Sequence, residues 1–197
     1  MPKIVDHEKQ KQLVAEAVWR IIRKEGMEGA TVRKIAEEAG VSAGSLRHYF
    51  GSQSELLAFS MGFVSQKVKD RISGLTFTGD SMEDAQKLLY EFLPLDEEKS
   101  AEMEVWMAFT IKALSDSTLK ELSSRVYEEM KMAITLIIDT LIEKSLAKEE
   151  IDRDAQIEIL YALVDGLALH GIMQPNQVNA EVMKRSINHY LGSICRY

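Results

Sequence analysis

The chain has 197 residues, of which 46% are hydrophobic, and it carries 24 Lys+Arg against 31 Asp+Glu, a formal net charge of −7. This apolar content is typical of a globular protein, and a single cysteine excludes an internal disulfide framework. The charged N-terminal sequence MPKIVDHEKQKQ does not resemble a signal peptide, and no unbroken apolar run reaches the roughly 18 residues of a membrane span. We therefore expect a cytoplasmic protein with no membrane partner.

The spacing of the apolar residues predicts an all-α fold of about nine helices, because these residues recur every three or four positions rather than every two. The chain has only three prolines, and the stretches between them are rich in strong helix formers. The expected helices cover residues 6–25, 32–39, 43–50, 53–73, 81–93, 100–115, 118–146, 154–173 and 180–194.

Capping residues mark the ends of the first four helices. Gly26 and Gly40 are natural helix stops, and Thr31 and Ser42 can cap the helices that follow them. The sequence SQSE at residues 52–55 fits a capping box, with the serine as cap and the glutamate reaching back. In the first helix the expected apolar stripe consists of Leu13, Ala17, Val18, Ile21 and Ile22.

The helix expected at residues 43–50 is too short to be stable alone, so Leu46 and Phe50 should hold it against the helices before it. A helix, a tight turn with glycine and a short second helix form a helix-turn-helix, which binds the major groove of DNA. Small residues would allow close approach to a groove, and cationic side chains can donate to phosphates or base edges. The pattern alone leaves two readings open, a DNA-binding face or a solvated polar face. The face in question presents Ala43, Gly44, Arg47 and His48, flanked by Ser45 and Tyr49.

Residues 26–50, G-x-x-x-A-T-V-x-x-I-A-x-x-A-G-V-S-x-G-S-L-x-x-Y-F, resemble the DNA-binding domain of the TetR family of bacterial regulators. The resemblance implies phosphate contacts from Thr31 and Tyr49. It also implies a set that faces the major groove, with Ser42 at the start of the helix: Arg33, Ala43, Gly44, Ser45, Arg47 and His48.

Two positions of this chain depart from the family pattern. The family usually has an aromatic residue where this chain has Arg47, and a phosphate-binding lysine where it has Gln53. Gln53 therefore lacks the charge of the usual contact, and Arg47 can either restore a phosphate contact or read a base.

The charge is divided unevenly along the chain. Residues 1–54 hold nine Lys+Arg and seven Asp+Glu, so the acidic excess lies entirely in the remainder. A positive head on an acidic body resolves how an acidic protein could bind a polyanion. We expect a helix-turn-helix DNA-binding domain at residues 1–54 and a ligand-binding and dimerisation domain at residues 55–197.

The resemblance implies that helices of the second domain enclose a cavity for a small apolar or amphipathic effector. An aromatic and methionine stripe at helical spacing equally well fills a core, and this alternative stays open. The candidate pocket residues are Phe92, Met103, Trp106, Met107, Phe109, Thr110, Tyr127 and Met130.

The helix expected at residues 154–173 is apolar on more than one face, so it needs a second partner. The resemblance implies that this partner is the same helix pair of a second subunit, in a four-helix bundle, and the run DGLALH resembles the BetI-like subgroup. Gly166 and Gly171, with Ala162 and Ala168, would allow close helix approach there. The predicted dimer-interface residues are Leu160, Leu163, Val164, Leu167, Gly171, Met183, Ile187 and Tyr190.

The predicted function is that of a homodimeric repressor that a small molecule releases from an inverted-repeat operator in double-stranded DNA. Two other classes of function are alternatives: an adaptor on the same scaffold that no longer reads an operator, and an enzyme. The weak head charge and Gln53 favour the adaptor, whereas the intact S-x-G-S-L-x-x-Y-F favours the regulator. No catalytic, metal-binding or phosphate-cradling motif occurs in the sequence, so we expect no enzyme activity, cofactor or metal.

Overall fold

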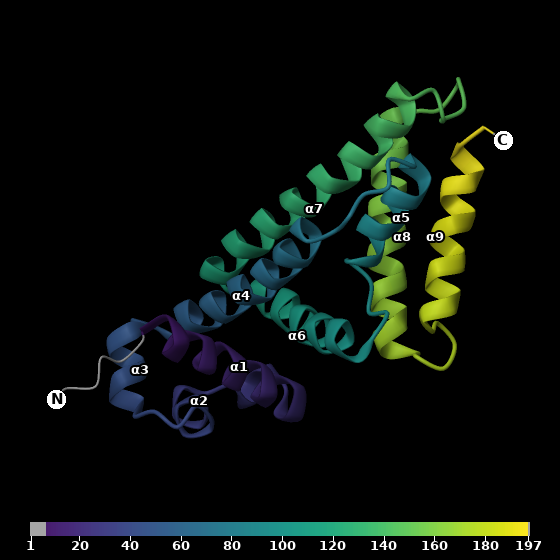
Figure 1. Cartoon of the computed structure of the whole chain (residues 1–197). Helices are drawn as coiled ribbons and strands as arrows, with labels where there is room; N and C mark the ends of the chain where they lie inside the picture. The colour runs from purple at the N-terminus through teal and green to yellow at the C-terminus, as the bar shows by residue number, and fades with distance from the viewer. Residues whose placement is uncertain (1–6, 197) are drawn as a thin grey trace. The chain divides into compact units, whose positions relative to one another are not determined.

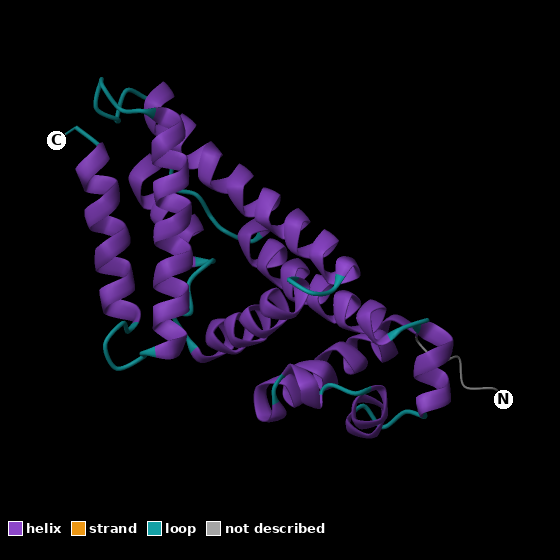
Figure 2. Ribbon diagram, turned by 180° about the vertical axis from the view of Figure 1, so that it is seen from behind, coloured by secondary structure: helices purple, strands orange, loops and turns teal. Residues whose placement is uncertain are grey.

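The computed structural model describes residues 7–196, with only the backbone for His7 and Glu8. Over this range the chain forms nine α-helices and one short 3-10 helix, and its only extended pairing is an isolated bridge between Ala147 and Cys195 (Figures 1 and 2). The all-α prediction is confirmed. The elements are α1 (His7–Glu25), η1 (Met27–Gly29), α2 (Val32–Glu38), α3 (Ala43–Tyr49), α4 (Gln53–Ser73), α5 (Ser81–Tyr90), α6 (Glu97–Ala113), α7 (Ser117–Glu143), α8 (Arg153–Met173) and α9 (Ala180–Ile194).

The chain divides into two compact units. Unit 1 contains the residues up to Lys67 together with Glu104–Ser124, and unit 2 contains Val68–Met103 and the residues from Arg125 onward. The divisions fall inside α4, α6 and α7, so each of these helices contributes to both units.

Unit 1 is built around α1, α2, α3 and the first part of α4. Ile35 of α2 and Leu46 of α3 are fully buried between these helices, as the short α3 requires, and Phe50 stacks on Phe59 with ring centroids 5.2 Å apart. In α1 four of the five expected stripe residues are buried, namely Ala17, Val18, Ile21 and Ile22, whereas Leu13 is 45% exposed and its neighbour Val14 is buried instead. The later segment of the unit adds four buried side chains to the same core: Val105, Phe109, Ala113 and Leu119.

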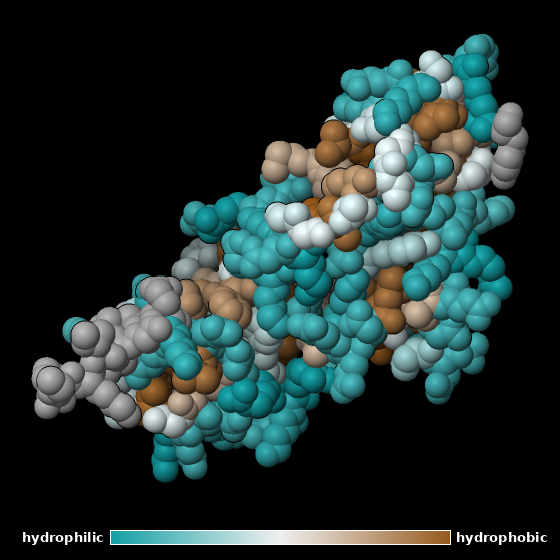
Figure 3. Space-filling view, viewed as in Figure 1, coloured by the Kyte–Doolittle hydropathy of each residue, from teal (hydrophilic) through white to brown (hydrophobic). Residues whose placement is uncertain are grey.

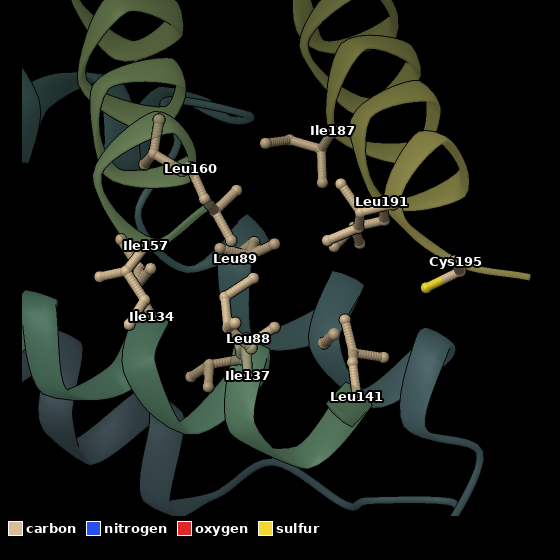
Figure 4. Packing of buried hydrophobic residues seen from close by; sticks show 14 of the residues in the cluster. Leu88, Leu89, Ile134, Ile137, Leu141, Ile157, Leu160, Ile187, Leu191 and Cys195 are labelled. Atoms are coloured by element: carbon tan, nitrogen blue, oxygen red, sulfur yellow. The ribbon is translucent and has the colours of Figure 1, made fainter. Parts of the chain in front are cut away.

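Unit 2 has a separate core between α5, α7, α8 and α9 (Figure 4). Helices α8 and α9 lie side by side in both ribbon views, and α5 packs against α9. Gly171 of α8 lies at a close contact within this unit, because a Cβ atom there would be 3.1 Å from both Met183 Sδ and Pro94 Cγ and would require these side chains to shift by a few tenths of an ångström. The labelled core residues are Leu88, Leu89, Ile134, Ile137, Leu141, Ile157, Leu160, Ile187, Leu191 and Cys195.

A partly buried charge network joins α4, α5 and α6 within unit 2. The guanidinium of Arg71 donates two hydrogen bonds to Glu102, at 3.0 and 2.9 Å, and a third to Glu91 at 2.9 Å. Lys99 also pairs with Glu91 at 2.9 Å. Burial alone would lower the pKa of Arg71, but the hydrogen bonds to the two carboxylates raise it.

Helix α8 is long and apolar enough to cross a membrane by length and composition alone, which corrects the expectation that no segment would qualify. One such helix is weak support for a membrane span. Five of its residues, including Ile157, Leu160 and Val164, are buried in unit 2, so packing accounts for part of its apolar character. The face of the chain seen in Figure 3 is mainly hydrophilic, with separate hydrophobic patches.

Candidate functional site

The helix-turn-helix of unit 1 forms where the capping residues predict it. The Thr31 side chain accepts from the Lys34 amide and caps α2, and the Ser42 hydroxyl accepts from the Ser45 amide at 3.0 Å and caps α3. The turn between the helices contains Gly40 with φ +67°, a left-handed conformation that favours glycine. These local interactions fix the direction in which the short α3 leaves the turn.

The first turn of α4 completes the motif. The Ser52 hydroxyl accepts from the Glu55 amide at 3.1 Å, as in a capping box. The Glu55 carboxylate accepts from the Gly51 amide at 2.9 Å, one residue earlier than a standard box places it.

Two arginines of α2 and α3 have exposed side chains without an intramolecular partner. Within the described residues, the guanidinium groups of Arg33 and Arg47 make no hydrogen bond or ion pair. His48 is also exposed, and its ring centroid lies 5.8 Å from that of Tyr49. These side chains are therefore available for an anionic partner.

Other cations of unit 1 are neutralised by carboxylates. Arg20 pairs with Glu38 at 2.6 Å, Arg23 pairs with Glu104 at 2.7 Å, and Lys34 pairs with Glu25. The hydrogen bond from Lys34 lowers the pKa of Glu25. Arg33 and Arg47 differ from these three cations, because their side chains have no carboxylate partner within the described residues.

The small residues at the start of α3 are not required by the chain itself. A Cβ atom at Gly44 would make only an ordinary 3.7 Å contact with Ser42 Oγ, and the backbone there is not left-handed. Glycine in a helix interior costs about 1 kcal/mol relative to alanine. A glycine that its own fold does not need leaves room for close approach by something outside the chain.

The ten predicted DNA-binding residues all lie in unit 1 and are exposed or partly exposed. Five of them make intramolecular hydrogen bonds through their side chains. Thr31 and Ser42 cap α2 and α3, and the Ser45 hydroxyl lies 3.0 Å from that of Ser42. The Tyr49 hydroxyl donates to Gln10 Oε1 at 3.4 Å, and Gln53 Nε2 donates to the Ala30 carbonyl at 2.8 Å. Gln53 thus ties the first turn of α4 to the segment that precedes α2.

The predicted pocket residues do not gather in one unit. Four belong to unit 1 and four to unit 2. Phe109 is fully buried in the core of unit 1, where its ring centroid lies 5.4 Å from that of Trp106. Its surroundings are those of a core residue, which was the alternative to a pocket residue. The unit 1 members are Trp106, Met107, Phe109 and Thr110, and the unit 2 members are Phe92, Met103, Tyr127 and Met130.

Unit 2 contains an acidic aromatic cluster of which the sequence analysis named only Tyr127 as a site residue. Tyr127 of α7 and Tyr161 of α8 lie with ring centroids 4.8 Å apart, and Asp165 follows Tyr161 by one helical turn. Loss of hydration raises the pKa of Asp165 to about 6 although the residue keeps part of its surface exposed. Burial, and then the nearby Asp165 carboxylate, raise the pKa of Tyr161. The Lys131 ammonium lies 5.6 Å from the centroid of the Tyr127 ring, which shows that this ring can face a cation.

The predicted dimer-interface residues are divided between the core and the surface. Leu160, Val164, Met183 and Ile187 have their side chains buried in the core of unit 2, and Gly171 is buried in α8 as well. Leu163, Leu167 and Tyr190 are partly exposed, and the Tyr190 hydroxyl donates to Gln156 Oε1 at 2.8 Å. Five of the eight predicted residues thus lie in the core of their own subunit, and three keep some exposed surface.

The outward face of α8 is apolar as well. Ile159, Leu169 and Met173 are 49%, 41% and 61% exposed. Gly166 lies at the centre of the same face at helical spacing, and a Cβ atom there would meet nothing within 4 Å. The helix periodicity could have indicated this face, since these residues lie opposite the buried set.

A head of this geometry and an all-α body define a DNA-binding transcriptional regulator of the helix-turn-helix class. Residues 15–58 match the family model described as bacterial regulatory proteins of the tetR family, and residues 81–196 match the model described as the C-terminal part of BetI-type transcriptional repressors. The chain belongs to the TetR family of bacterial transcriptional regulators.

Relatives match over almost the full chain. The HTH-type transcriptional regulator PksA of Bacillus subtilis is 45% identical over 197 residues, which cover 99% of this chain and 94% of PksA. The regulator BetI of Vibrio vulnificus is 31% identical and covers 97% of this chain and 92% of its own. These relatives are transcriptional regulators, and the chain is not an enzyme.

Solved structures share the fold. A transcriptional regulator from Rhodococcus is 29% identical with a TM-score of 0.82 and covers 93% of this chain and 95% of its own. A putative regulator from Saccharomonospora viridis, solved in complex with choline, is 21% identical with a TM-score of 0.87 and covers 96% of this chain and all of its own.

Proposed function

We propose that the protein is a homodimeric repressor that binds an inverted-repeat operator in the bacterial cytoplasm and is released by a small-molecule effector. The observation that carries the proposal is a pair of exposed arginine side chains without intramolecular partners, Arg33 and Arg47. They accompany Gly44, a position where the fold itself has room for a side chain. Two such heads would read half-sites separated by about one helical turn, roughly 34 Å, or somewhat more.

DNA reading is tested by fluorescence anisotropy with the intergenic DNA that flanks the protein's own gene and with a scrambled duplex, at roughly 50 and 200 mM salt. A specific regulator binds the native segment more tightly than the scrambled one and loses affinity as salt increases. An adaptor that has lost operator reading would bind both duplexes equally, or neither, even after selection from random DNA.

Gly44→Leu tests the proposed approach of α3 to the groove. The fold has room at this position, so the variant should unfold at the same temperature as the wild type or higher, yet lose specific binding. Gly62→Leu is the matched control, because Gly62 is another helical glycine of unit 1 with open space around its Cβ position. Normal operator binding by Gly44→Leu would contradict the assigned reading face.

The outward face of α8 is the proposed dimer surface. Its apolar side chains need cover, and the open position of Gly166 allows a second helix to approach closely. Gly166→Arg should therefore leave each subunit folded and shift sedimentation from dimer to monomer. A dimer that survives Gly166→Arg would place the interface elsewhere.

The proposed effector is an amphipathic organic cation. The Tyr127–Tyr161 pair offers ring faces and Asp165 offers a partly desolvated negative charge, and the choline complex of the Saccharomonospora viridis regulator shows that this fold can hold such a ligand. Calorimetry with choline and with its neutral carbon isostere, 3,3-dimethylbutan-1-ol, separates charge from shape. Binding of choline alone, weakened by Tyr161→Leu, supports the proposal, and equal binding of both molecules contradicts it.

A further inference from the structure

The later segment of unit 1, Glu104–Ser124, is an integral part of the DNA-binding unit. In sequence it lies inside the stretch that matches the C-terminal family model, yet it packs with the head. Phe109 and Leu119 are completely buried in the same cluster as Leu56 and Met61 of α4. The corner between α6 and α7 is therefore held against the first turns of α4 by a continuous apolar core.

Asp116 lies at this corner, and its carboxylate accepts hydrogen bonds from both α7 and α4. Its Oδ1 accepts from the amides of Thr118 and Leu119, at 3.0 and 3.3 Å, and so caps α7. Its Oδ2 accepts from the hydroxyl of Ser54 on α4 at 2.5 Å. The bond from Ser54 lowers the pKa of Asp116, so the carboxylate is ionised at neutral pH and the bond is charge-assisted.

Ser54 belongs to a turn that also contacts the DNA-reading helices. The preceding residue, Gln53, donates to the Ala30 carbonyl, one residue before the cap of α2. Glu55 accepts from the Gly51 amide, two residues after α3 ends. Adjacent side chains of one helical turn thus reach the start of α2, the end of α3 and the α6–α7 corner.

From this junction we propose that Asp116 is a positioning residue for DNA binding: through Ser54 it holds the first turn of α4, and with it α2 and α3, in the arrangement that binds DNA. The inference rests on the proposed function. Coupling between two sites is reciprocal, so DNA bound at α3 must in turn stabilise the α6–α7 corner.

The test uses the full-length protein and a duplex that the wild type has selected from random DNA. Amide hydrogen exchange is measured over residues 112–122 with and without this duplex, and its affinity is measured for each variant. Ser54→Ala removes only the hydroxyl and leaves Asp116 to cap α7, whereas Ser54→Thr retains a hydroxyl. Asp152→Asn, which alters the corresponding cap of α8 in unit 2, is the control.

In the wild type, the duplex should slow exchange at the corner. Ser54→Ala should bind about fivefold more weakly and lose this DNA-dependent protection, because one charge-assisted hydrogen bond is missing. Ser54→Thr and Asp152→Asn should bind DNA and show protection as the wild type does. The melting temperatures of Ser54→Ala, Ser54→Thr and Asp152→Asn should all be close to that of the wild type.

Unchanged affinity and protection in Ser54→Ala, or no protection of the corner in the wild type, would overturn the role of Asp116 while leaving DNA reading intact. A lower melting temperature with normal DNA-dependent protection would show a purely structural bond and would also overturn it. Failure of the selection to enrich any duplex would refute the proposed function, and this inference with it.

Discussion

Asp165 makes the stability of the protein depend on pH in the direction opposite to that of an ion-paired carboxylate. Its pKa is about 6 in the folded chain, against an ordinary value of 3.8, because the folded environment removes part of the hydration of the carboxylate. Between these two pH values the folded chain holds a proton that the unfolded chain releases. The free energy of unfolding should therefore increase as pH falls through about 6.

The expected size of the effect follows from the shift. Two pKa units correspond to at most about 3 kcal/mol, and the solvent that still reaches the exposed part of Asp165 reduces this to about 1 kcal/mol. Asp165→Asn removes the penalty of a charged carboxylate. The variant should be more stable than the wild type by about 1 kcal/mol near pH 8, and the difference should vanish near about pH 4.

Urea unfolding at a series of pH values measures this difference, with protein concentration held constant because subunit association adds to stability. Glu150→Gln, an exposed carboxylate in the connection before α8, is the control and should change stability little at any pH. A variant that is less stable than the wild type near neutral pH, or a difference that does not change with pH, would refute the assignment of the desolvated charge to Asp165.

Three further substitutions test the structure. Gly40→Ala should cost about 1 kcal/mol in urea unfolding, since the surroundings are open and only the left-handed backbone opposes a side chain; no loss would mean that the turn adapts. Phe109→Ala should cost about 3–5 kcal/mol by the same measurement, because the ring is completely buried, and a loss below 1 kcal/mol would place it at a surface. Glu102→Ala should cost about 2 kcal/mol, at the lower end for a buried pair because Arg71 keeps Glu91; an unchanged unfolding midpoint would show the network to be dispensable.

Local signals predicted the head well. Thr31, Ser42 and Ser52 cap the helices that their positions indicate, and Gly26 and Gly40 both adopt left-handed backbone at helix ends. Such features depend on a few neighbouring residues, so they can be predicted from the local sequence.

The sequence is less informative about which face of a helix is buried. Both faces of α8 are apolar, and of the eight residues assigned to the dimer interface five, among them Leu160 and Val164, are buried within their own subunit, while three are partly exposed. Periodicity cannot separate two apolar faces, because the partner of each is set by tertiary packing. The same limit explains α1, where the prediction included Leu13 in the buried stripe but the structure buries its neighbour Val14.

Contacts between distant segments left no local signal. Ser54 and Asp116 are 62 positions apart, and Tyr127 and Tyr161 belong to different helices. Nothing in either neighbourhood of the sequence indicates the other, so only the fold brings these pairs together.

The contribution of residues 104–124 to unit 1 bears on how regulators of this kind could be recombined. A DNA-binding unit cut off after α4 would lose Val105, Phe109, Ala113 and Leu119 and would expose the apolar side chains that they cover. Fusing it to the C-terminal domain of a distant relative would replace these four residues by side chains that do not match its core. A working chimera should therefore carry the α6–α7 corner with its own head, and evolutionary exchange of operator specificity should proceed more readily by substitutions on α2 and α3 than by exchange of whole domains.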